Sequence, residues 1–138
     1  MCWISGGTAI RKIAERDFYV YKIGQVIWDN IFVSQIKKHQ YFPKCSSRII
    51  PLVTITPCRG SDIIQSGYHS YKWVALDNPH LGNRCLYLGN YIFKISLEEY
   101  KYCCVGTFIV PKGAEYFENK YGHIVSSDII YTGKYLKL

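Results

Sequence analysis

Five consecutive side chains at residues 68–72 could do chemistry, because the run Tyr-His-Ser-Tyr-Lys combines phenols, an imidazole, a hydroxyl and an ammonium. His69 is the centre of interest, since an imidazole can act as a general acid or base or bind a phosphate. If the run is a strand, alternate residues share a face, so Ser70 points away from His69 and a Ser–His dyad is not expected. The alternative for His69 is a hydrogen-bonded core residue.

Two glycine-containing turns could supply further contacts to an anion. Lys112 lies in a Pro-Lys-Gly sequence and Arg59 in an Arg-Gly-Ser sequence. Backbone amides in such turns can assist a cation in binding phosphate, although ordinary structural turns have the same composition. The ligand-binding residues that the sequence predicts are Tyr68, His69, Tyr71, Lys72, Arg59 and Lys112.

The six cysteines predict free thiols rather than a metal site. No C-x-x-C pair is present and the four histidines do not pair at short spacing, so neither a metal nor a cofactor is predicted. Without a secretory signal, we expect reduced thiols in a cytosol. Cys103 and Cys104 lie in an apolar run and are expected in the core. Cys2 would become an N-terminal nucleophile if Met1 were removed.

The charge of the chain favours anionic partners. The formal net charge is +7, from 17 Lys and Arg against 10 Asp and Glu. Such an excess suits a nucleotide, a nucleic acid or the acidic surface of another protein. No apolar run approaches the ~18 residues of a membrane helix, so we expect no membrane partner and a cytoplasmic location. Exposed strand edges can pair with a second copy of the chain, so a homo-oligomer is an open alternative.

Short strands must position these side chains, because aromatic and β-branched runs alternate with turn signals. A turn is predicted at Asp29-Asn30, and a hairpin is predicted around Gly89-Asn90. The strands are expected at 17–23, 49–56, 67–74, 101–110, 114–117 and 124–131, with a loop at 58–66.

The pattern predicts a mostly-β fold, either a sandwich or a partly open barrel of about seven or eight short strands. An α+β fold is the alternative if Arg11–Arg16 or Ala75–Leu81 is helical. The length of 138 residues predicts one domain over 1–138, with an irregular segment at 1–16.

Four motifs occur in the order Met1-Cys2-Trp3, Gly67-Tyr68-His69-Ser70-Tyr71, Ile109-Val110-Pro111-Lys112-Gly113 and Tyr121-Gly122-His123. Taken together, they resemble those of a family of small proteins from tailed phages and gut anaerobes that has no established activity. Similar sequences have Phe where Tyr68 stands and often Glu where His123 stands, and residues 25–65 match poorly. The resemblance implies a phage or mobile-element protein that acts in a bacterial cytosol.

The strand, Pro-Lys-Gly turn and short strand near the C-terminus also resemble the last third of ADP-ribosyltransferase-like domains. Ser126 and Ser127 stand where those enzymes carry a catalytic Glu, so this resemblance implies nucleotide binding rather than transfer. We therefore expect a non-catalytic phage accessory protein that sequesters a nucleotide signal and so counteracts host defence. The alternatives are an inhibitor that binds a host defence protein or nucleic acid, and a nucleotide-processing enzyme with His69 as acid or base.

Overall fold

The computed structural model of the chain describes residues 3–4, 10–35, 38–45, 54–58, 61–64, 67–76, 83–96, 103–119 and 121–137. These residues form fifteen strands and one 3₁₀ turn, η1 (Trp28–Asn30), and no α-helix occurs among them. The predicted mostly-β fold is confirmed. The strands are shorter and more numerous than expected, because runs such as 67–74 break where the backbone turns.

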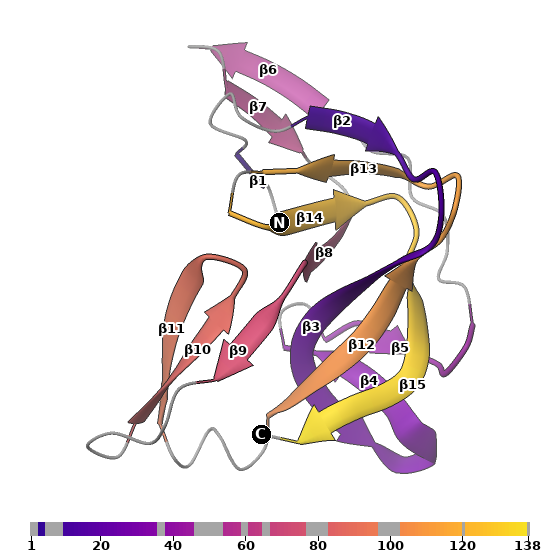
Figure 1. Ribbon diagram of the computed structural model, residues 1–138, viewed down its shortest axis with the longest axis vertical. Coiled ribbons are helices and arrows are strands. Elements are labelled where there is room, and N and C mark those ends of the chain that lie inside the picture. The colour runs from indigo at the N-terminus through magenta and orange to yellow at the C-terminus, as the bar shows by residue number, and fades with distance from the viewer. Residues whose placement is uncertain are drawn as a thin grey trace.

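The largest sheet is antiparallel and contains nine strands. β4 (Ile31–Ser34) pairs with the last part of β3, and β5 (Gln40–Tyr41) pairs with β4. A single residue pair, Tyr21 and Tyr71, joins the described strands β3 and β8, and the sheet bends there (Figure 1). The main path follows the order β15 (Ile130–Lys137), β12 (Cys104–Val110), β3 (Phe18–Ile27), β8 (Tyr68–Tyr71), β14 (His123–Ser126), β13 (Glu115–Glu118) and β2 (Ile10–Ile13).

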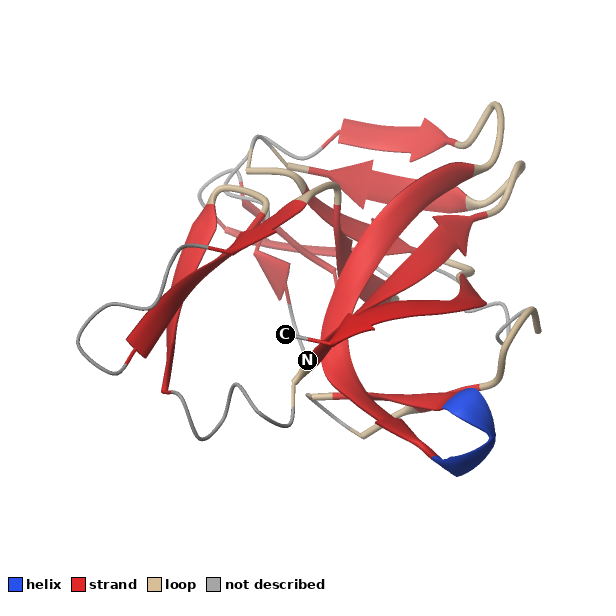
Figure 2. Ribbon diagram, turned by 60° about the horizontal axis from the view of Figure 1, so that its bottom comes forward, coloured by secondary structure: helices blue, strands red, loops and turns tan. Residues whose placement is uncertain are grey.

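Two three-stranded sheets complete the described fold. One contains β1 (Trp3–Ile4), β7 (Ser61–Ile64) and β6 (Thr54–Cys58). The other contains β9 (Val74–Leu76), β10 (Asn83–Leu88) and β11 (Tyr91–Ser96), and it stands apart from the large sheet as a separate layer (Figure 2). Leu86 and Leu88 of β10 pack with Tyr21 and Tyr71 of the large sheet, so a second hydrophobic cluster joins the two layers.

Phe32 lies at the centre of the main core. Its ring is fully buried, and its centroid lies 5.1 Å from that of Phe108, 5.5 Å from that of Tyr131 and 6.5 Å from that of Tyr41. Gly106 leaves the space for this ring, because a Cβ atom there would lie 2.6 Å from the ring of Phe32. Close packing of this kind fixes β4 against β12 and β15.

The two predicted turns are confirmed. Asp29 and Asn30 adopt φ values of 58° and 56°, which reverses the chain between β3 and β4. The Asn30 side chain donates to the Gly133 carbonyl at 2.7 Å and accepts from the Tyr131 hydroxyl at 3.0 Å. Gly89, with φ of 60°, turns the chain between β10 and β11.

Several local predictions are wrong. The possible helical turn at Arg11–Arg16 begins as β2, and the irregular segment 1–16 also contains β1. The predicted loop 58–66 contains β7, and the run 124–131 breaks into β14 and β15. Ala75 and Leu76 belong to β9, while 77–81 lie outside the described residues. β1 and β2 are strands because they pair with β7 and β13, which are distant in the sequence, and such pairing overrides weak local preferences.

Candidate functional site

Alternation along β8 places the reactive run on two faces. Tyr68 and Ser70 are buried at 6% and 0% exposure, and Tyr68 belongs to the main core. His69 and Tyr71 are half-buried on the reverse face, where Tyr71 packs against the second cluster. Ser70 therefore points away from His69, as predicted, and these two residues do not form a nucleophile–base pair.

A second histidine joins His69 on this face. The pairing of β8 with β14 puts His123 opposite Tyr71 and diagonal to His69. His69 Nδ1 and His123 Nε2 are 3.0 Å apart, and the rings of Tyr71 and His123 stack with centroids 5.0 Å apart. One imidazole must donate and the other accept in such a bond. Local reasoning missed His123, because 54 residues separate it from His69.

The surroundings of His123 keep it neutral. Burial, with a smaller effect of the positive charges of His69 and Lys22, lowers the pKa of His123 to about 3. A general acid or base works best with a pKa near the operating pH. His123 therefore suits a role in orienting His69, and the Asn119 side chain fixes it by accepting the His123 backbone N–H at 3.0 Å.

Lys22 lies behind His69 on the core side of β3. Lys22 is 8% exposed. Its ammonium donates a hydrogen bond to the His69 carbonyl and lies 5.5 Å from the centre of the Tyr41 ring. Burial lowers the pKa of Lys22 to about 8. The Lys22 side chain thus links β3 to the backbone of β8.

The remaining predicted ligand residues do not gather around His69. Lys72 follows β8 and its Nζ lies 2.5 Å from Glu118 Oε1. Lys112 lies in the turn between β12 and β13, where its backbone N–H donates to Asp17 Oδ1 at 2.7 Å. Arg59 lies outside the described residues. The structure therefore brings together His69 and Tyr71, and it places Lys112 beside the connection from β2 to β3.

An open groove of about 500 Å³ lies along that connection, and we call it the Arg16 groove. Two backbone bonds hold the connection against the β12–β13 turn: Ala14 N donates to Ala114 O at 2.9 Å, and Gly113 N donates to Ala14 O at 2.8 Å. The turn that contains Lys112 is thus joined to Ala14 in the groove wall, although Lys112 does not itself line the groove. The lining residues are Lys12, Ile13, Ala14, Glu15, Arg16, Phe18 and Tyr116.

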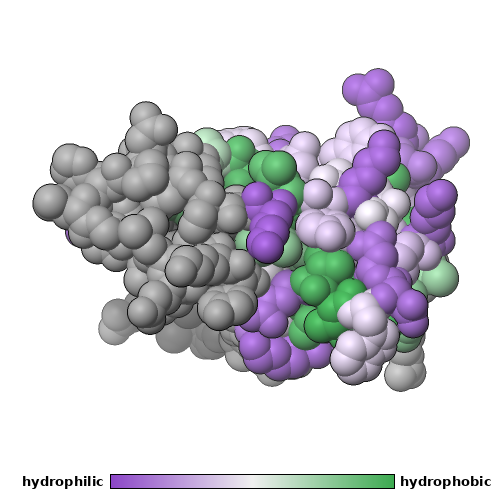
Figure 3. All heavy atoms as spheres, turned by 90° about the horizontal axis from the view of Figure 1, so that it is seen from below, coloured by the Kyte–Doolittle hydropathy of each residue, from purple (hydrophilic) through white to green (hydrophobic). Residues whose placement is uncertain are grey.

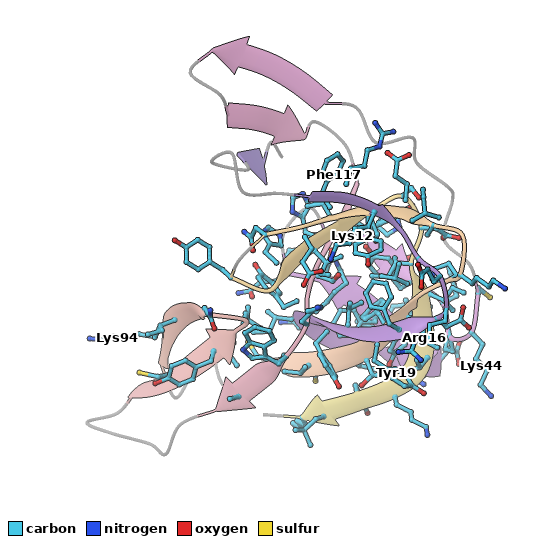
Figure 4. The ribbon with its side chains drawn as sticks, turned by 45° about the horizontal axis from the view of Figure 1, so that its top comes forward. Lys12, Arg16, Tyr19, Lys44, Lys94 and Phe117 are labelled. Carbon is cyan, nitrogen blue, oxygen red and sulfur yellow. The ribbon has the colours of Figure 1, made fainter. Side chains whose placement is uncertain are left out.

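The Arg16 groove combines rings with cations. The half-buried rings of Phe18 and Tyr116 touch, with centroids 5.0 Å apart and planes inclined at 58°. Lys12 Nζ pairs with Glu118 at 3.3 Å, whereas Arg16 forms no ion pair with any described residue. Figure 4 shows Lys12 and Arg16 on the same stretch of chain. Local reasoning missed Arg16, Phe18 and Tyr116, because the pairing of β2 with β13 brings them together.

Four of the described cysteines form no disulfide, namely Cys45, Cys85, Cys103 and Cys104. Cys103 and Cys104 are buried at 8% and 6% exposure, as predicted, and burial raises the pKa of the Cys104 thiol. A raised pKa disfavours the reactive thiolate. Cys2 lies outside the described residues. Among the side chains that the structure describes, no group of three His, Cys, Asp or Glu is arranged to hold a metal ion.

Comparisons with protein families, curated proteins and solved structures find no match to this chain. Within the described ranges, none of the helical structure is long and apolar enough to cross a membrane. Function is therefore inferred from the geometry of the described residues.

Proposed function

We propose that this protein binds a nucleotide in the Arg16 groove and holds it without converting it. The observation that carries this proposal is that one open groove contains two touching rings and an arginine that pairs with no described carboxylate. A nucleotide presents a flat base and an anionic phosphate. Rings bind the first by stacking, and a guanidinium binds the second through charge-assisted hydrogen bonds.

The size and charge of the groove agree with such a ligand. Its volume of about 500 Å³ lies within the range of roughly 300–1,000 Å³ that small-molecule sites occupy. Lys12 and Arg16 both line the groove, so two cations can contact a phosphate there. The net charge of +7 draws anions toward the protein. On the face seen in Figure 3, apolar residues form small patches between hydrophilic ones.

The position of the histidine pair favours binding over turnover. Tyr116 lies opposite Ser126, which lies opposite Tyr68, so these three residues share the core side of the sheet. His69 and His123 occupy the reverse face, because neighbours along a strand alternate. An acid or base at His69 therefore does not reach a ligand in the groove. This arrangement supports sequestration over nucleotide processing.

The resemblance to small phage proteins supplies a biological setting for this proposal. In that setting, the ligand is a nucleotide signal that a bacterium uses in defence, and capture of the signal counteracts the defence. A host defence protein or a nucleic acid as the direct target is the competing outcome of the test below.

The experiment is mass spectrometry of small molecules released by heat from protein purified from phage-challenged and unchallenged bacteria. We expect an intact nucleotide at about one copy per chain. Arg16→Gln should lose it, whereas Lys94→Gln, which removes an exposed charge from the distant β11, should retain it (Figure 4). Empty spectra from both preparations, a chemically altered nucleotide, or equal retention by both variants contradicts the proposal.

A further inference from the structure

The main core contains a cation that forms no ion pair with any described carboxylate. Lys22 is 8% exposed, and its ammonium contacts the His69 carbonyl and the face of the Tyr41 ring. The ion pairs among the described residues all use Glu115 or Glu118, and none reaches Lys22. An ammonium has three N–H donors, so the carbonyl leaves two of them available. A buried charge without a counter-ion is costly.

A buried hydroxyl lies across from Lys22, because the antiparallel pair of Tyr21 and Tyr71 puts Ser70 opposite Lys22 one residue along. Ser70 is fully buried, and its Oγ has no hydrogen-bond partner among the residues that the structure describes. Lys22 contacts the carbonyl of the peptide that joins His69 to Ser70, and Ser70 shares the core side of β8 with Tyr68. Buried hydroxyls are normally satisfied by protein or by a bound species. The unused donors of Lys22 and Ser70 therefore face the same part of the core.

Two histidines lie within the electrostatic reach of Lys22. Lys22 lowers the pKa of His39 and of His123, in each case after the larger effect of burial. The ring of His39 contacts that of Tyr41 at 4.6 Å and that of Tyr68 at 5.9 Å. His39 is itself exposed, so it marks the point where this part of the core meets solvent.

We propose that Lys22 and Ser70 bind a small monovalent anion of the size of chloride, which enters beside His39. The anion accepts hydrogen bonds from the ammonium and from the Ser70 hydroxyl, and it supplies the counter-charge that Lys22 lacks. Because Lys22 is almost fully enclosed, a large hydrated anion is excluded. This site is separate from the Arg16 groove and does not depend on the proposed nucleotide.

Chloride-35 NMR tests the site, because bound chloride broadens the resonance of the free ion. We expect excess line width with the natural protein, its loss with Lys22→Met, and its retention with Lys94→Met, which removes an exposed lysine. Replacing a buried charge by an apolar side chain is often neutral or stabilising, so Lys22→Met should fold. Ser70→Ala should weaken chloride binding about fivefold, as expected for one lost hydrogen bond.

Bromide soaked into crystals of the natural protein gives a measurement that needs no variant. We expect an anomalous peak within contact distance of Lys22 Nζ. The proposal is overturned if no such peak appears, or if Lys22→Met keeps the excess line width of the natural protein.

Discussion

Acid should destabilise this protein through His123 well before its carboxylates are protonated. The pKa of His123 is about 3 in the folded chain against an ordinary value of 6.5. Between these values the unfolded chain binds a proton that the folded chain does not, so the free energy of unfolding falls as the pH falls. From pH 7 to pH 5 the loss is about 2 kcal/mol, at about 1.4 kcal/mol per pH unit once the unfolded histidine titrates fully.

This loss is a large part of the roughly 5–15 kcal/mol that stabilises a typical domain. Between pH 7 and pH 5 the loss comes from protonation of His123 in the unfolded chain alone, because His123 remains neutral in the folded chain. The bonds of Glu118 to Lys72 and Lys12 lower the pKa of its carboxyl group, despite burial. Protonation of Glu118 also lowers the free energy of unfolding as the pH falls, but only below pH 4.5, the ordinary pKa of the group. Between pH 7 and pH 5, the change in the free energy of unfolding therefore reports the titration of histidine rather than that of Glu118.

Urea unfolding at pH 7 and pH 5, followed by circular dichroism, measures the effect. His123→Gln should remove most of the 2 kcal/mol difference, whereas His39→Gln, at an exposed histidine, should leave most of it. A proton NMR titration of His123 adds a direct measurement and should show no protonation above pH 5. The reasoning is refuted if the natural protein is equally stable at both pH values, or if His123 titrates near 6.5.

Two further predictions concern the core. Gly106→Ala should destabilise the fold by about 1–3 kcal/mol in urea unfolding, because its Cβ meets the enclosed ring of Phe32 and this outweighs the ~0.4–1 kcal/mol that Gly→Ala gains through the unfolded chain. If Gly106→Ala were more stable than the natural protein, the Phe32 ring would have to move aside at little cost. In chloride-free buffer, the free energy of unfolding should rise by about 1 kcal/mol from pH 8 to pH 9, because Lys22 loses its proton in the folded chain before the unfolded one. Lys22→Met should abolish this rise in the free energy of unfolding. If the variant kept the rise, a group other than Lys22 would be its source.

Local sequence patterns predicted the structure correctly where it depends on contacts between residues close together in the chain. Asp29-Asn30 and Gly89-Asn90 turn as expected, because left-handed backbone suits Asn, Asp and Gly in short connections. Alternation correctly separated Ser70 from His69, since a strand places neighbours on opposite faces. The apolar run ending at Val110 is a buried strand, as its composition indicated.

Long-range pairing decided what local signals could not. β2 carries no apolar stripe, and it is a strand because β13, about a hundred residues later, supplies its hydrogen-bond partners. The same pairing sets Tyr116 beside the segment that contains Arg16. Lys22 lies in the middle of an aromatic strand, and the carbonyl that its buried ammonium contacts belongs to His69, 47 residues later.

The most direct test of the nucleotide site is a backbone amide NMR titration with the four ribonucleoside monophosphates and a cyclic dinucleotide. We predict that at least one of these probes shifts the amides of Ala14–Phe18 and Tyr116 and leaves those of His69–Tyr71 unmoved. Shifts centred on His69–Tyr71, or no shifts with any probe at millimolar concentration, would contradict the assignment of a nucleotide to the Arg16 groove.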